Sequence, residues 1–93
     1  MNAAVSKVFI AFQDNEESRP VVDAILNDNP HAEAAYTPGL VKISAANRLS
    51  VRRESIEEQT GRPYDLQQIH INLVTLSGNV DETDDELSLE WHS

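Results

Sequence analysis

The 93-residue sequence contains no cysteine. This absence excludes disulfide bonds, thiolate metal sites and thiol nucleophiles, and it fits a reducing, cytoplasmic location. Aromatic residues make up only 5% of the chain, so the core of a single small domain must be built mainly from Val, Ile, Leu and Ala. Such a core is small, and we expect a marginal stability that a bound partner increases.

Long apolar segments are also missing. The longest runs, such as Val8 to Phe12, are too short to cross a bilayer, and the N-terminus lacks the features of a signal peptide. The formal charge of −9 argues against nucleic acid and anionic membranes as partners, because phosphate would repel the chain. Two interpretations of this acidity stay open, which are docking on a basic surface and solubility alone.

The sequence has few residue patterns that are typical of catalytic, metal-binding or phosphate-binding sites. The glycines are Gly39, Gly61 and Gly78, and the histidines are His31, His70 and His92. Isolated glycines cannot form a phosphate-binding loop, and scattered histidines lack the short spacings of metal ligands. No serine has the glycine pattern of a nucleophile elbow. The sequence therefore predicts no catalytic site and no metal site.

Two charged segments have alternative interpretations. The acidic stretch 81–86 lacks the central glycine of an EF-hand, so it is either a solvated loop or a docking surface for a basic partner. Arg52, Arg53 and Glu54 precede a short predicted helix, where N–H groups favour negative charge. They form either an anion site or a local, salt-bridged helix entry.

Hydrophobic patterning predicts the elements of the first half of the chain. Residues 1–6 show no periodicity and are expected to form a flexible tail. The following elements are a strand over 7–12, a helix within 15–29, and strands over 33–36 and 40–44. Ser18 is the expected N-cap of the helix, and Pro20 fits its first turn.

The second half has the same order of elements. We expect a strand over 48–52, a short helix that ends at Gly61, a strand over 69–76, a turn over 77–79 and a last strand. Ser55 and Glu58 have the spacing of a capping box. Leu87, Leu89 and Trp91 alternate along the last strand. Trp91 is expected to close the core, and contact with a partner is the alternative. The predicted fold is α+β, with two βαββ modules, 7–46 and 47–91, in one domain over 7–93.

Three segments carry a resemblance to a known family: KVFIAFQDNEESRPVVDAI, LVKISAANRLSVRRESIEEQTGRPYDLQQI and HINLVTLSGNVDETDDELSLEW. Together they resemble the regulatory component of bacterial phenol hydroxylases. More broadly, the chain is similar to the effector proteins of bacterial multicomponent monooxygenases, which include component B of soluble methane monooxygenase. The long N-terminal tail of that component is absent, so no role of the tail is carried over.

The resemblance implies a non-catalytic protein without a cofactor. Its partner would be a hydroxylase whose large subunit carries a diiron centre beneath a canyon into which the effector docks. A separate iron–sulfur flavoprotein reductase would supply electrons from NADH. Docking would then promote hydroxylation of a phenol coupled to the oxidation of NADH.

The resemblance also implies contact residues. The segment Ser77, Gly78, Asn79 and Val80 matches the family's stretch that approaches the hydroxylase, although an ordinary turn stays open as the alternative. Arg19 and Asp23, outward on the predicted helix, are expected rim contacts. Arg52, Arg53 and Glu54 are expected further contacts.

Two other classes of function are open to a small α+β domain. A metabolite-binding regulatory domain would need a pocket with converging polar groups. A small hydrolase of ferredoxin-like fold would need an anion-binding loop, and the isolated glycines count against it. Both alternatives rest on analogy of fold alone.

Overall fold

The fold is given by a computed structural model that describes residues 7–91. The predicted tail over 1–6 lies outside this range. In chain order the elements are β1 (Lys7–Gln13), α1 (Arg19–Asp28), β2 (Glu33–Thr37), β3 (Leu40–Ala46), β4 (Arg48–Arg52), α2 (Arg53–Thr60), the 3₁₀ turn η1 (Leu66–Gln68), α3 (Ile69–Asn72), β5 (Leu73–Ser77), β6 (Asn79–Glu82) and β7 (Glu86–Glu90). The predicted α+β class is confirmed.

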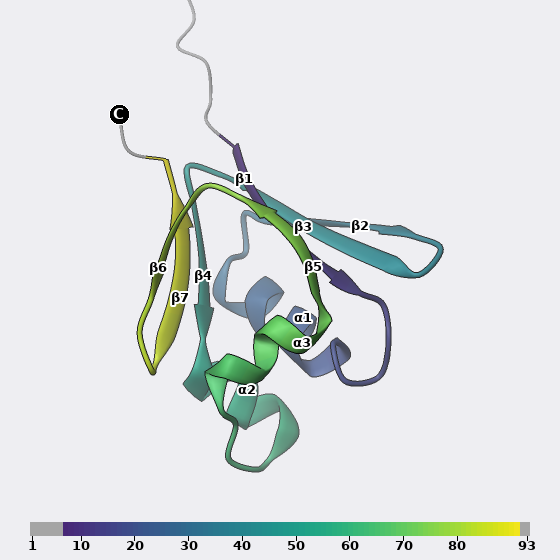
Figure 1. The fold of residues 1–93 in the computed structure, drawn as a ribbon, viewed down its shortest axis with the longest axis vertical. Helices are drawn as coiled ribbons and strands as arrows, with labels where there is room; N and C mark the ends of the chain where they lie inside the picture. The colour runs from purple at the N-terminus through teal and green to yellow at the C-terminus, as the bar shows by residue number, and fades with distance from the viewer. Residues whose placement is uncertain (1–6, 92–93) are drawn as a thin grey trace, which may run out of the picture.

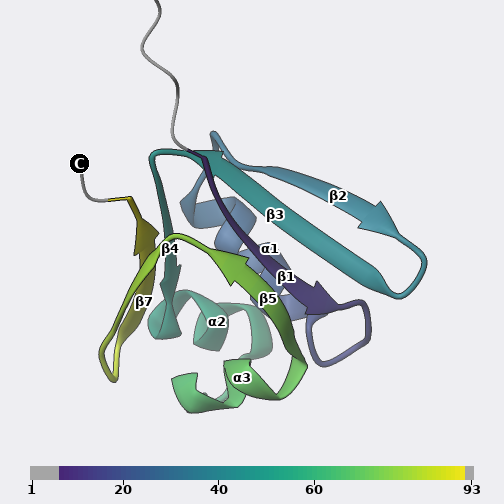
Figure 2. The same ribbon diagram turned by 45° about the horizontal axis from the view of Figure 1, so that its top comes forward.

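The strands form two antiparallel sheets. One has the order β2-β3-β1-β5 and the other the order β4-β7-β6. The chain passes from the first sheet to the second twice, at Asn47 between β3 and β4 and at Gly78 between β5 and β6. Figures 1 and 2 show both passages at the same end of the molecule. Because β5 pairs with β1, residues 7–46 and 47–91 share a sheet.

One continuous core lies between the sheets and the helices. The apolar positions of β1, β4 and β7 alternate as expected, which buries one face of each strand. Helix α1 adds Val21, Val22, Ala24 and Ile25 to the same core. The strands predicted over 7–12, 33–36, 40–44 and 48–52 are all present, with small shifts at their ends.

The starts of α1 and α2 differ from the prediction. Ser18 occupies the N-cap of α1, but its hydroxyl makes no capping bond; instead Asn15 Oδ1 accepts from the Ser18 N–H at 2.9 Å. The predicted capping box is wrong, because α2 begins at Arg53 and Ser55 lies buried within its first turn. The Arg53 N–H donates to the Asp85 carbonyl at 2.9 Å, so a distant segment fixes this helix start.

The strand predicted over 69–76 begins only at Leu73. Asp65 Oδ1 caps the preceding turn by accepting from the Gln67 N–H at 3.0 Å, and residues 66–72 then form η1 and α3. Leu66 and Ile69, three residues apart, are both buried, whereas Ile71 is 68% exposed. A helical spacing of three therefore competes with the alternation of Ile69 and Ile71, and the helical spacing determines the structure.

Trp91 does not close the core. It follows β7, its side chain is 46% exposed, and its indole N–H donates to the Lys7 carbonyl at 2.8 Å. Because an indole needs a partner for its N–H, a position at the protein surface next to the Lys7 carbonyl suits it better than the aliphatic core. Trp91 therefore joins the end of the second sheet to the beginning of the first.

The buried side chain of Asn29 connects α1 to β4. Its amide nitrogen donates to the carbonyls of Ile25 and Ser50, each at 2.7 Å, and its oxygen accepts from the Ser50 N–H at 3.1 Å. The amide thus pairs with Ser50 much as a neighbouring strand would, and it also satisfies a carbonyl at the end of the helix. The sequence analysis identified Asn29 only as a helix end.

We predict that Asn29→Asp lowers the free energy of unfolding by about 3 kcal/mol, because a carboxylate would replace the donor that faces two carbonyls. Urea denaturation followed by circular dichroism measures this change. Asn27→Asp, the same chemical change at an exposed position of α1, should cost only about 0.5 kcal/mol. Equal losses for the two variants would contradict the role of Asn29.

Candidate protein-binding surfaces

The described part of the chain offers surfaces rather than a chemical centre. Among residues 7–91, no three His, Cys, Asp or Glu side chains come together in a way that would hold a metal ion. Within the same range, no helix is long and apolar enough to span a membrane. His70 lies instead beside Glu82, with Nε2 3.0 Å from Oε1, and links α3 to β6.

The segment Ser77 to Val80 is a corner between the two sheets and not the simple turn that was predicted. Ser77 ends β5 opposite Phe9, and Asn79 begins β6 opposite Glu90. Asn79 is exposed, and Val80 is 45% exposed on the edge strand β6. A strand pairing on each side therefore holds the exposed residues of this corner in fixed positions.

Gly78 is required at this corner for two reasons. Its φ of +133° lies in a region that residues with a side chain rarely adopt. A Cβ at this position would also lie only 2.9 Å from Val8 Cγ1. The corner is therefore packed directly against β1, which makes it a rigid part of the surface.

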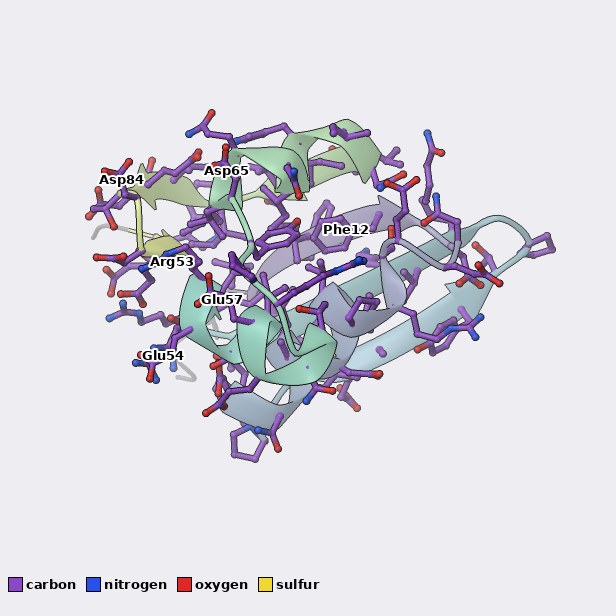
Figure 3. All side chains as sticks on the ribbon, turned by 90° about the horizontal axis from the view of Figure 1, so that it is seen from below. Phe12, Arg53, Glu54, Glu57, Asp65 and Asp84 are labelled. Atoms are coloured by element: carbon purple, nitrogen blue, oxygen red, sulfur yellow. The ribbon has the colours of Figure 1, made fainter. Side chains whose placement is uncertain are left out.

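The predicted contacts Arg52, Arg53 and Glu54 lie around a hollow of about 370 Å³ that Asp85 and Glu86 complete. Figure 3 labels Arg53 and Glu54 at the start of α2. Arg53 pairs with Asp85 at 2.6 Å and with Glu57 at 3.1 Å, while Arg52 lies 3.7 Å from Glu54.

These ion pairs favour the local, salt-bridged interpretation of the segment over an anion site. The hydrogen bond to Asp85 and the charge of Glu57 raise the pKa of Arg53 above its usual value. Carboxylates of the same chain therefore already satisfy this guanidinium. An external anion would have to displace them.

The nine predicted contact residues do not form one surface. Arg19 and Asp23 are exposed on α1, opposite its buried face. The corner at Asn79 lies at the Arg48 end of the second sheet, whereas Arg52 lies at the other end of β4, about 13 Å away. A partner that touched all nine residues would have to extend around the molecule.

The sequence analysis missed a groove of about 590 Å³ at the end of the molecule opposite the corner. It is lined by residues from three segments, within 16–20, 60–64 and 68–72. The Tyr64 side chain is half-buried there, and burial, followed by the charges of Asp65 and Glu17, raises the pKa of its hydroxyl. The sequence offers no direct signal for this groove, because the fold alone brings its three walls together.

Comparisons with known proteins identify the family. The model of the MmoB/DmpM family matches residues 6–90, so the chain belongs to this family. It is 50% identical over 86 residues to the stimulatory component DmpM of phenol 2-monooxygenase from Pseudomonas sp. strain CF600, which covers 92% of this chain and 96% of that protein. The resemblance described from the sequence is thereby confirmed.

Solved structures agree with this assignment. A chain from the structure of a phenol hydroxylase–regulatory protein complex matches with a TM-score of 0.90 and 46% identity, over 94% of this chain and all of that one. The regulatory protein B of soluble methane monooxygenase matches with a TM-score of 0.72 over 98% of this chain and 71% of its own. At 17% identity, this second likeness shows a shared fold alone.

We predict that Gly78→Ala lowers the free energy of unfolding by about 2–4 kcal/mol, through backbone strain and the contact with Val8. Gly39→Ala is the matched control. Gly39 also has a positive φ, of +79°, but a Cβ there would have no atom within 4 Å. The control should lose only about 1–2 kcal/mol, so similar losses in urea denaturation would contradict the close packing of the corner.

Proposed function

We propose that this protein is the non-catalytic regulatory component of a multicomponent phenol monooxygenase and acts by binding the hydroxylase component. The observation that carries the proposal is the 50% identity to a phenol 2-monooxygenase stimulatory component, which extends over nearly the full length of both chains. The likeness to a chain from a phenol hydroxylase–regulatory protein complex supports the same partner. A cytoplasmic location remains a prediction.

The finer parts of the proposal concern electron flow. The hydroxylase would contain a diiron centre, a reductase with an iron–sulfur cluster and a flavin would deliver electrons from NADH, and the regulatory protein would couple NADH oxidation to hydroxylation. Tight binding alone cannot couple NADH oxidation to hydroxylation, because a protein that binds two hydroxylase states equally does not change their populations. A stimulation of about 100-fold requires a barrier lower by about 2.7 kcal/mol.

The geometry supports the corner Ser77–Val80 as a contact with the hydroxylase. Its exposed residues are held between two strand pairings and a close packing contact, so little conformational entropy is lost when they are fixed at an interface. Arg19 and Asp23 on α1 are proposed rim contacts. Arg52, Arg53 and Glu54 are proposed as weaker contacts, because their charges are already paired within the chain.

The direct test is reconstitution. Purified phenol hydroxylase and its reductase are assayed for phenol oxidation and NADH consumption while this protein is titrated. We expect the hydroxylation rate and the ratio of product to NADH both to rise and then saturate. If rate and ratio stay constant across the full titration, the proposed function is wrong.

We predict that Asn79→Ala raises the half-saturating concentration in this assay roughly three- to tenfold. Asn79 is exposed on an edge strand, so the free energy of unfolding should hardly change. Asn27→Ala, exposed on α1, is the control and should titrate like the unaltered protein. Normal stimulation by Asn79→Ala would show that the corner is not a contact.

A further inference from the structure

The groove opposite the corner combines negative charge with apolar walls. It runs between the start of α1, the loop after α2, and α3, and Glu16 and Glu17 bring two carboxylates to it. The Tyr64 ring and the side chains of Pro63 and Ile71 supply the apolar part of its lining. Such a mixture suits a ligand with an apolar stem and a cationic end.

A small buried cavity lies beside the groove. A cavity of about 10 Å³ adjoins the groove, sharing Glu17 and Tyr64 with it and also bordered by Phe12 and Ser18. Figure 3 views the molecule from this end and labels Phe12. Ser18 is only 2% exposed, and no group in the described chain forms a hydrogen bond with its Oγ. A cavity of this size has room for at most about one water molecule, so a side chain that lies in the groove cannot reach the Ser18 hydroxyl.

The electrostatic environment of the groove favours a cation. Arg62 also lines the groove, but it balances only one of the two carboxylates, and Asp65 adds another negative charge beside them. Burial is the main cause of the raised pKa of Tyr64, and the charges of Asp65 and Glu17 act in the same direction because they disfavour a phenolate. The lining of the groove therefore has a net negative charge.

The walls of the groove are fixed before any ligand binds. Asn15 Nδ2 donates to Asn72 Oδ1 at 2.8 Å, which ties the end of α3 to the start of α1. The Tyr64 N–H donates to Glu57 Oε2 at 2.9 Å, which holds the loop after α2 against that helix. A groove that is already formed loses little entropy on binding.

We propose that this groove receives a lysine or arginine side chain from a basic segment of the hydroxylase. The stem packs against Tyr64 and Ile71, and the charged end lies near Glu16 and Glu17. The inference rests on the proposed function, because it assigns the groove to that same partner.

The surface between the groove and the corner supports a protein as the occupant. The chain runs directly from α3 through β5 to the corner Ser77–Val80, so one continuous segment, residues 69–80, contributes to both surfaces. Of the five large apolar side chains that are exposed in residues 7–91, this segment carries Ile71, Val74 and Val80. A single partner that lies along β5 would cover them and reach both surfaces.

The test compares groove variants with the unaltered protein in direct binding to purified hydroxylase, by fluorescence anisotropy at low and at moderate salt. The double variant Glu16→Gln/Glu17→Gln should weaken binding roughly five- to tenfold and reduce the salt dependence. Glu33→Gln, an exposed carboxylate on β2, is the matched control and should bind normally. If the double variant binds as the control does, the groove is not a contact.

The thermal unfolding of the double variant separates binding from folding. Glu16 and Glu17 are both exposed, so the midpoint of thermal unfolding should hardly change while hydroxylase binding weakens. Weaker binding that only follows a lower midpoint would overturn the proposal. Sedimentation of the free protein tests for another occupant. If the protein self-associates and the double variant does not, a second copy of the chain occupies the groove, and the proposal is wrong.

Assays of the unaltered protein distinguish a failure of the proposed function from a failure of the groove proposal. If that protein neither binds nor stimulates the hydroxylase, the proposed function fails and the groove proposal fails with it. If the unaltered protein does both and the groove variants match it, only the groove proposal fails.

Amide NMR at low ratios of hydroxylase to protein gives an independent measurement. We expect the amide signals of residues 16–20, 60–64 and 68–72 to broaden. Broadening of signals only outside these segments would contradict the proposal.

Discussion

The hydrogen bonds of one side-chain amide, that of Asn29, hold helix α1 against strand β4 of the second sheet. The amide pairs with Ser50 on the edge strand β4 and with Ile25 at the end of α1, so it occupies the place of a further strand. Helix α1 is thereby fixed against the second sheet, and α2 packs next to it. The groove depends on this arrangement, because its walls come from the start of α1 and from the segment after α2.

Most of the fold could be predicted from patterns that are local in the chain. The alternation of Val8, Ile10 and Phe12 and the spacing of the apolar residues of α1 each report one buried face. The errors have two causes. A distant residue, Asp85, fixes the start of α2. Between 66 and 72, two local patterns compete, and the helical spacing of the buried Leu66 and Ile69 replaces the first half of the predicted strand with a helical turn.

The candidate site was less predictable than the fold, for a related reason. The resemblance in sequence indicated the family and the segment 77–80, but it could not show that this segment joins two sheets. Arg52, Arg53 and Glu54 are adjacent in sequence, yet their charges are largely neutralised by partners that include Asp85. The groove draws on three separated segments, so no sequence motif marks it, and its walls come together only in the folded chain.

The pairing of β1 with β5 has a consequence for how the protein folds as it is made. Phe9 on β1 pairs with Ser77 on β5. Strand β1 is synthesised well before β5, so the first sheet cannot be completed until β5 has left the ribosome. Until then, β1 has only β3 beside it, and one of its edges is open. Contacts between such distant residues slow folding, and the first half of the chain cannot reach its final form by itself. The protein is therefore expected to finish folding in one late step, after most of its sequence has been synthesised.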